Sequence, residues 1–196
     1  MEYVEFKGIE IELIKTAELS KLCDTKTPQG IVGVFHFRAE SAQELLNEKI
    51  IIALENISDP GNMGTILRNC DWFGIKNILL SPDCAEMYNP KVIRASAGSL
   101  FHLNVFEEKD FIGSLITLKE SGFKLVCTDL NGSDLYEYQK NEKDLIILAN
   151  EANGPTENLL GICDHKITIP KIGEAESLNV ASASAVILSE LTRPKP

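Results

Sequence analysis

Residues 145–191 read LIILANEANGPTENLLGICDHKITIPKIGEAESLNVASASAVILSEL, and this stretch decides the expected fold. It opens with residues 145–149, a continuous run of apolar and mostly branched side chains. Such a run is typical of a strand that is buried on both faces of a parallel sheet. The run stops at Asn150 and Glu151, so polar side chains stand at the expected end of the strand.

A second strand is expected soon afterwards. A loop with Gly154 and Pro155 leads into a short helical segment at residues 156–160, and a second branched run at residues 166–169 ends at Pro170. In open α/β sheets, ligands bind beyond the carboxyl ends of the strands. The ends of these two strands are therefore predicted to border one crevice.

The last part of the stretch is rich in small residues. Ser177, Leu178 and Asn179 precede the alanines and serines of residues 181–185, and Ser177 is the predicted N-cap of a helix. Small side chains let a helix approach a neighbouring backbone or a bound ligand closely. From composition alone, an ordinary buried helix is the more frequent explanation.

The segments NEANGP and CDHKITIPKIGEAESLNVASASAVILSEL resemble the carboxyl-terminal motifs of a known family. This is the SpoU (TrmH) family of RNA ribose 2′-O-methyltransferases, in the SPOUT superfamily. The family pattern has Gly-x-Glu-Gly at the first strand end, Ile-Pro at the second, and Ser-Leu-Asn-Val before the last helix. The chain departs from it at Ala149, where the family usually has glycine, so one methyl group is expected to crowd that contact slightly.

A second informative stretch, LENISDPGNMGTILRNCDWFGIKNILL, covers residues 54–80 and follows a branched run at residues 50–54. Its apolar residues recur at helical spacing over residues 63–73, which predicts an amphipathic helix with Asn62 as N-cap and Gly74 at its end. Arg68 lies away from the apolar stripe and, taken alone, fits a solvated side chain. The stretch is also similar to the first SpoU motif, and Asn62 and Arg68 match the family's functional asparagine and arginine.

Further strands are predicted at residues 76–80, 102–105 and 123–128, and helices at residues 88–97 and 111–121. The helix at residues 88–97 carries a lysine followed by Arg-x-Ser-x-Gly, a phrase that resembles one often found in the family. Lys91 and Arg94 of this phrase could contact phosphates or could form an ordinary solvated helix face.

Residues 1–48 are too few to close a core of their own. Residues 8–15 and 31–37 are predicted strands, and residues 16–22 are predicted to form a helical turn. The segment AELSKLCDTKTPQGIVGVF resembles the end of the L30e-like substrate-binding domain that precedes the methyltransferase domain in many SpoU proteins. Residues 1–48 are therefore expected to be a partial L30e-like domain with a linker, and residues 49–196 the methyltransferase domain.

The composition limits the function. With 44% hydrophobic and 24% charged residues, the 196-residue chain is typical of a globular protein with a sizeable core. No transmembrane stretch, signal peptide, Cys-x-x-Cys pair or metal-ligand spacing is present, so a cytoplasmic protein with free thiols and no metal is expected. A net charge of −10 argues against nucleic-acid binding, although an average says nothing about one face.

The pattern of strands and helices predicts an α/β fold with a parallel sheet flanked by helices. On pattern alone this would be a plain doubly wound sheet. The resemblance implies instead the SPOUT arrangement, in which the C-terminal segment passes through a loop to form a deep trefoil knot. Such knots are exceptions to the usual rules of chain topology.

The resemblance also implies the chemistry and its partners. S-adenosylmethionine would bind in the knot, and the methyl acceptor would be a ribose 2′-hydroxyl of RNA, with ribosomal RNA favoured over transfer RNA. Family members often complete their site across a dimer interface, so a homodimer is expected. The cofactor-binding residues implied in this way are Ala149, Asn150, Gly154, Ile169, Leu178 and Thr128.

The catalytic residues implied by the resemblance are Arg68, Asn62, Glu151, Ser177 and Asn179. Arg68 would either accept the hydroxyl proton, which is demanding because guanidinium is almost always protonated, or fix the adjacent phosphate and stabilise the developing alkoxide. Glu151 would orient Arg68 or Asn179, while Asn62 and Ser177 would hold the ribose and its phosphate.

Two other classes of protein remain as alternatives. One is a non-catalytic RNA-binding or cofactor-binding module that kept the knot, which the acidic composition favours and the complete set of motif residues opposes. The other is a flavodoxin-like or Rossmann-like protein for another nucleotide. The SDPGNMG loop has too few glycines for the phosphate loop that such a protein needs.

Overall fold

A computed structural model describes residues 10–23, 27–34, 42–150 and 153–194 of the chain, with only the backbone of residues 42–44. The chain divides into two compact units, Met1–Ala39 and Glu40–Pro196. In the first unit, helix α2 (Thr16–Leu22) confirms the predicted helical turn.

The two strands predicted in the first unit are wrong where they can be checked. Residues 10–15 and 31–34 belong to no strand, and Leu13 and Val34 expose their side chains to solvent. A strand needs a partner for its backbone groups, and among the described residues none pairs with these segments. Residues 8, 9 and 35–37 of the predicted strands lie outside the described residues.

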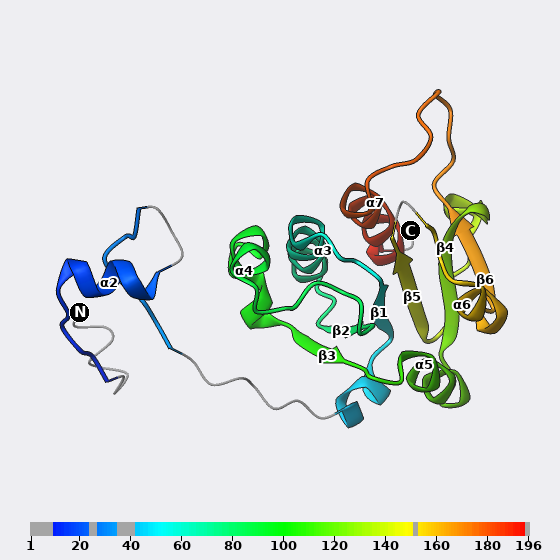
Figure 1. The fold of residues 1–196 in the computed structure, drawn as a ribbon. Coiled ribbons are helices and arrows are strands. Elements are labelled where there is room, and N and C mark those ends of the chain that lie inside the picture. The colour runs from blue at the N-terminus through cyan, green and yellow to red at the C-terminus, as the bar shows by residue number, and fades with distance from the viewer. Residues whose placement is uncertain (1–9, 24–26, 35–41, 151–152, 195–196) are drawn as a thin grey trace. The chain divides into compact units, whose positions relative to one another are not determined.

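The second unit is built on a sheet of six parallel strands (Figure 1). The strands are β1 (Ile50–Glu55), β2 (Asn77–Leu80), β3 (Asn104–Glu107), β4 (Lys124–Asp134), β5 (Asp144–Ala149) and β6 (His165–Thr168). Their spatial order is β3-β2-β1-β5-β4-β6, so β5 pairs with β1 although 88 residues separate Glu55 from Asp144 in the chain. The predicted parallel α/β sheet is confirmed.

Helices cover both faces of this sheet (Figure 1). One face packs against α3 (Pro60–Trp72), α4 (Pro90–Ser96) and α7 (Val180–Thr192), and the other against α5 (Phe111–Glu120) and α6 (Glu157–Ile162). The 3₁₀ helices are η1 (Ala42–Asn47), η2 (Ser99–His102) and η3 (Leu135–Glu137).

The central strands supply side chains to both cores. In β1, Ile52 and Leu54 join the core under α3 and α7, while Ile51 and Ala53 join the core under α5. Successive residues of a strand point to opposite faces, so a strand with a helix layer on each side has to be apolar at every position. This explains the continuous branched runs in the sequence.

Several predicted boundaries need correction. Asp59, not Asn62, is the N-cap of α3, because its side chain accepts a hydrogen bond from the Asn62 backbone N–H at 2.8 Å and Pro60 occupies the first turn. Asn179, not Ser177, is the N-cap of α7. In both helices the true cap is the residue whose side-chain oxygen can reach the free backbone N–H groups of the first turn.

Strand β4 is longer than the predicted segment at residues 123–128. It continues to Asp134 after an irregularity between Thr128 and Ser133 in its pairing with β6. Gly132 lies in this irregular part, and a Cβ atom there would come within 2.5 Å of the Ile167 backbone. The close approach requires glycine, and local propensity gives no sign of it.

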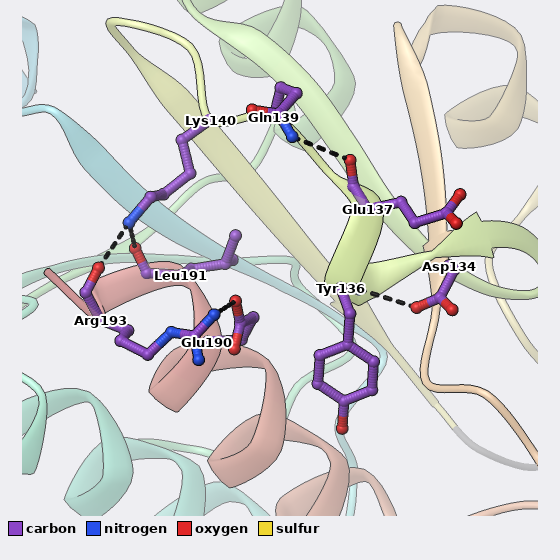
Figure 2. Close-up of polar contacts among 8 residues, drawn as sticks. All are labelled: Asp134, Tyr136, Glu137, Gln139, Lys140, Glu190, Leu191 and Arg193. Atoms are coloured by element: carbon purple, nitrogen blue, oxygen red, sulfur yellow. Dashed lines mark hydrogen bonds and ion pairs between the residues drawn. The ribbon is translucent and has the colours of Figure 1, made fainter. Parts of the chain in front are cut away.

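The C-terminal end of α7 is anchored by a lysine from the loop before β5 (Figure 2). The Lys140 Nζ donates hydrogen bonds to the carbonyl oxygens of Leu191 at 3.0 Å and Arg193 at 2.9 Å. A cation placed here also interacts favourably with the helix dipole. None of the helices in the described ranges combines the length and apolarity needed to cross a lipid bilayer.

Candidate active site

A cavity of about 640 Å³ lies at the carboxyl edge of the sheet, where β5 and β6 end and where the pairing of β4 with β6 becomes irregular. The irregular part of β4 (residues 128–131) and the end of β5 with residues 153–155 form part of its wall. The rest comes from Leu160, most of residues 167–178, and Val180, Ala183 and Ile187 of α7. The size and the mixed apolar and backbone lining suit a small organic ligand. The crevice predicted between the two strand ends is therefore present.

All six residues proposed to bind the cofactor line this cavity. They are Thr128, Ala149, Asn150, Gly154, Ile169 and Leu178, together with Ser177 from the catalytic set. The wall formed by the segment between β6 and α7 is exposed to solvent, and Leu178 shows 49% of its surface.

The loop after β5 is held in place by the end of β1. Glu55 is only 4% exposed, and its carboxylate accepts hydrogen bonds from the Thr156 backbone N–H at 3.0 Å and the Thr156 hydroxyl at 2.6 Å. Asn150 donates from its side chain to the Asn56 carbonyl at 3.1 Å. The Gly154 N–H in turn bonds to the Asn150 carbonyl at 2.8 Å.

Glu55 and Thr156 were not among the residues singled out from the sequence. A carboxylate at the end of an otherwise apolar strand, next to a functional motif, was the available signal. A buried carboxylate needs hydrogen-bond donors, so a donor to Glu55 is expected. The sequence does not tell which residue supplies that donor. Pairing of β1 with β5 brings Thr156 to this place.

The two family motifs meet between α3 and α7. The Asn179 Nδ2 donates to the Asn62 Oδ1 at 2.9 Å, although the two residues are 117 positions apart. The Asn179 Oδ1 accepts from the backbone N–H groups of Ala181 at 3.0 Å and Ser182 at 3.2 Å. One side chain therefore caps α7 and contacts α3.

A second contact fixes the two helices against each other. The Asn69 side chain, two turns after Asn62 on α3, donates to the Ala181 carbonyl at 3.0 Å and the Ser184 hydroxyl at 2.9 Å. Small residues on α7 allow this approach, as predicted from the alanines and serines of residues 181–185. Both asparagines show that this side of α3 faces α7.

Arg68 occupies a different side of α3. It is exposed, it does not line the cavity, and it makes no hydrogen bond or ion pair with any other residue of the described ranges. Six positions after Asn62, it is displaced by about 9 Å along the helix and about 120° around it. Within one chain, the structure therefore does not bring Arg68 to the cavity, and Glu151 lies outside the described residues.

Three of the four thiols of this unit are poor candidates for nucleophiles. Burial raises the pKa of Cys70 to about 12, and burial also raises the pKa of Cys84. The Cys163 thiol and burial together raise the pKa of Cys127, which precedes the cavity residue Thr128. These three cysteines stay protonated at neutral pH. The described residues contain no cluster of three or more His, Cys, Asp or Glu side chains that could hold a metal ion.

Comparison with known proteins identifies the family. The sequence pattern of the SpoU rRNA Methylase family matches residues 49–189. The 23S rRNA (guanosine(2553)-2′-O)-methyltransferase RlmP of Bacillus subtilis is 32% identical over 185 residues, which cover 94% of this chain and 73% of the relative.

Solved structures agree with this match. The AdoMet-bound rRNA methyltransferase from Sinorhizobium meliloti has a TM-score of 0.81 and 28% identity, with 90% of this chain and 69% of that chain covered. The SpoU methyltransferase AviRb from Streptomyces viridochromogenes, in complex with AdoMet, has a TM-score of 0.72 and 28% identity over 79% of this chain and 62% of that chain. The chain therefore belongs to the SpoU rRNA Methylase family of RNA ribose 2′-O-methyltransferases, whose methyl donor is S-adenosylmethionine.

Proposed function

We propose that this chain methylates a ribose 2′-hydroxyl in ribosomal RNA, with S-adenosylmethionine bound in the cavity at the carboxyl edge of the sheet. Relatives that act on 23S rRNA support the choice of ribosomal over transfer RNA. The observation that carries the site assignment is the contact between Asn62 and Asn179, which joins the two family motifs beside the cavity.

The residues around the cavity fit the proposed cofactor. Apolar side chains of Leu160, Ile169, Leu178 and Ile187 can bury an adenine ring, and backbone groups at the ends of β5 and β6 can bond to its polar edge. Gly154, with φ of 64°, keeps the loop in a conformation that other residues rarely adopt. When bound, S-adenosylmethionine supplies a methyl group activated by its positive sulfonium.

The side chains of the chain then position the acceptor. Asn62 and Ser177 hold the ribose and its phosphate, and Asn179 keeps Asn62 oriented through their hydrogen bond. Arg68 fixes the neighbouring phosphate and stabilises the negative charge that develops on the 2′-oxygen. Glu151 orients Arg68 or Asn179.

We also propose that two copies of the chain form the active enzyme. Arg68 is exposed and lies away from its own cavity, so a second copy is needed to bring an arginine to each site. Sedimentation velocity at micromolar concentration should show a dimer. A monomer with full methyltransferase activity would contradict this proposal.

The order of the C-terminal elements supports a knot. After β6 the chain makes an exposed excursion and returns as α7 against β5 and α3, while the loop after β5 is tied to Glu55. We propose that the chain passes through this loop to form the trefoil knot of the SPOUT superfamily. Stretching an unfolded molecule by its two ends should give a contour length shorter than 196 extended residues require.

We propose that residues 1–48 and residues 49–196 belong to two different domains. The family match begins at residue 49, and residues 1–39 form a separate unit, which supports residues 1–48 as part of an L30e-like substrate-binding domain with its linker. Substitution of both Gln29 and Ile31 by alanine should weaken the binding of RNA and leave the affinity for S-adenosylmethionine unchanged. Unchanged RNA affinity would remove the support for a substrate-binding role.

The proposed function is tested with an Arg68→Ala variant and an Arg193→Ala control. Arg193 is also exposed, but it pairs with Glu190 at the end of α7. Calorimetric titration should show the same affinity for S-adenosylmethionine in all three proteins. Methyl transfer to a ribosomal RNA pool should fall about 100-fold or more in Arg68→Ala only.

The outcomes separate the alternatives. Cofactor binding without any methyl transfer by the wild-type chain would favour a non-catalytic binding module. Absence of cofactor binding would refute the assignment of the cavity. Equal transfer to a transfer RNA pool would refute the preference for ribosomal RNA.

A further inference from the structure

Helix α3 packs against a different neighbour on each of its sides except one, which faces solvent. Met63, Ile66, Leu67 and Cys70 point into the core, and Asn62 and Asn69 face α7. Gly64 faces α4, because a Cβ atom there would lie 2.5 Å from the Ala95 Cβ. The remaining side carries Arg68 and, one turn later, Trp72.

Trp72 is unusual on this side. It is the single tryptophan of the chain and is 83% exposed, although tryptophan is among the residues that are on average highly buried in globular proteins. Phe101, which is 59% exposed, belongs to η2. Helix η2 is fastened to the same end of α3 by the hydrogen bond between His102 Nδ1 and Asp71 Oδ2 at 3.0 Å.

Basic side chains lie on the elements that neighbour these aromatic residues. Exposed Lys91 and Arg94 lie on α4, and Lys91 precedes by one turn the Ala95 that packs against α3. Lys76 follows α3. Desolvation raises the pKa of the Asp71 carboxyl, but the hydrogen bonds from His102 and Ser99, with a smaller contribution from the Lys76 charge, bring it below its ordinary value. Asp71 is the only acidic residue within α3, α4 and η2, and it is engaged by His102.

The contrast with the rest of the chain identifies the partner. In a protein with 29 acidic and 19 basic residues, the charged side chains of α3 and α4 are Arg68, Lys91 and Arg94 against the single carboxylate of Asp71, so the local charge complements a polyanion. Aromatic side chains next to cations are the usual means of binding unpaired RNA, because bases stack on the rings while the cations contact phosphates. In a duplex the bases are already stacked on each other and cannot use the rings.

We propose that the aromatic–basic face, defined by Arg68, Trp72, Lys91, Arg94 and Phe101, binds the unpaired RNA segment that flanks the methylated nucleotide. Trp72 stacks on one base of this segment, and Arg68 at the neighbouring turn of α3 connects the face to the reaction. The inference rests on the proposed function, since it assigns a surface to the substrate of the same site. It also specifies the substrate class as a loop or a single-stranded region.

The single tryptophan makes a direct test possible. Titration of the 196-residue chain with a short unpaired RNA of mixed sequence should quench the intrinsic fluorescence, because a stacked base quenches Trp72. The same RNA annealed to its complement should quench much less. Trp72→Ala should weaken binding of the unpaired RNA by about 5- to 100-fold, measured by fluorescence anisotropy of labelled RNA, and Trp72→Phe should restore most of it.

A matched control comes from Tyr136, an exposed aromatic residue on η3. Tyr136→Ala should leave RNA affinity and methyl transfer unchanged. In Trp72→Ala, the KM for RNA should rise while the affinity for S-adenosylmethionine stays that of the wild type, since Trp72 does not line the cavity. A variant that has only lost its fold would lose cofactor binding as well.

Two results would overturn the proposal. Unchanged RNA affinity and KM in Trp72→Ala, with active wild type, would refute the face while leaving the proposed function intact. Fluorescence that changes with protein concentration but not with RNA would show that a second copy of the chain covers Trp72. If the wild-type chain methylates no RNA, the proposed function itself fails, and RNA quenching of Trp72 then reports on binding alone.

Discussion

Asn179 performs two tasks with one side chain. Its Oδ1 caps α7, and its Nδ2 donates to Asn62 on α3. The cap stabilises a 13-residue helix whose first turn adjoins the cavity, and the donor connects the two motifs of the family. The two tasks depend on different atoms, so substitutions can separate them.

Asn179→Ala should lower the free energy of unfolding by about 1–2 kcal/mol, because both the cap and the contact with Asn62 are lost. Asn179→Asp keeps an oxygen for the cap and places a negative charge at a helix N-terminus, so its stability should stay near that of the wild type. Methyl transfer should fall in both variants. Denaturant unfolding and a transfer assay measure the two effects, and full activity of Asn179→Asp would show that the donor to Asn62 is dispensable.

Asp164 illustrates how one carboxylate fastens the edge strand β6. It accepts the Leu125 backbone N–H at 2.9 Å and lies 3.1 Å from the Lys119 Nζ. Desolvation raises the pKa of Asp164, but the hydrogen bonds from Leu125 and Lys119 and the nearby lysine charges outweigh it, so the pKa lies below its ordinary value. A carboxyl whose pKa is lower in the folded state stabilises that state above the unfolded pKa of about 4.

Asp164→Asn should therefore lower stability by about 1 kcal/mol at neutral pH, and the difference from the wild type should shrink as the pH falls below about 4, through the folded pKa. Chemical unfolding at a series of pH values measures this. Lys119→Met should reduce the same pH dependence, since it removes the main partner charge. A difference that stays constant down to acid pH would mean that the charge of Asp164 is not responsible.

At the scale of elements, α3 is organised by what each of its sides meets. Its apolar stripe enters the core, its asparagines meet α7, and Gly64 lets α4 approach closely. The periodicity of the sequence predicted the stripe correctly. It did not distinguish the remaining sides, because a polar residue at helical spacing is compatible with solvent, another helix or RNA.

Gly64→Ala should separate α3 from α4. The added methyl would lie 2.5 Å from the Ala95 Cβ and 2.6 Å from the Val92 carbonyl oxygen, so the helices must shift, at a cost of about 1–3 kcal/mol. Gly161→Ala in α6 is the control, because nothing lies within 4 Å of its added Cβ, and it should be neutral or stabilise by up to about 1 kcal/mol. Thermal or denaturant unfolding compares the two, and equal stability of both variants would contradict the close packing.

At the scale of the whole molecule, the chain has a negative net charge, yet the aromatic–basic face carries cations that are proposed to bind RNA. A net charge of −10 repels RNA at a distance, whereas local cations contact phosphates within a Debye length of about 8 Å at physiological salt. RNA binding should therefore be of moderate strength and depend on few ion contacts. The salt dependence of the affinity measures how many.

If Arg68, Lys76, Lys91 and Arg94 each contact a phosphate, the slope of log affinity against log salt concentration should be about −3 for unpaired RNA. The double substitution of Lys91 and Arg94 by alanine should make the slope less steep by about 1.4. Double substitution of Lys124 and Lys166, which lie on β4 and β6, should leave it unchanged. An equal slope in both double variants would place the phosphate contacts elsewhere.

By itself, the sequence determined the buried strands, the helices with apolar stripes and the residues of the two motifs, because these depend on local periodicity and on recognisable spacing. In the first unit the sequence predicted strands that the structure does not contain at residues 10–15 and 31–34. These residues have the pattern of strands, but no described strand pairs with them. Alternation indicates that a segment could join a sheet, and pairing requires a neighbour that local pattern cannot supply.

Only the tertiary structure decided which distant residues meet. The insertion of β5 between β1 and β4 brings Thr156 to the buried Glu55, and the return of α7 against α3 brings Asn179 to Asn62. The tertiary structure also keeps Arg68 away from the cavity of its own chain, and it leaves Trp72 exposed on the same side of α3 as Arg68. These relations follow from the order of strands in the sheet, which is set by the packing of the whole unit and not by any one stretch of sequence.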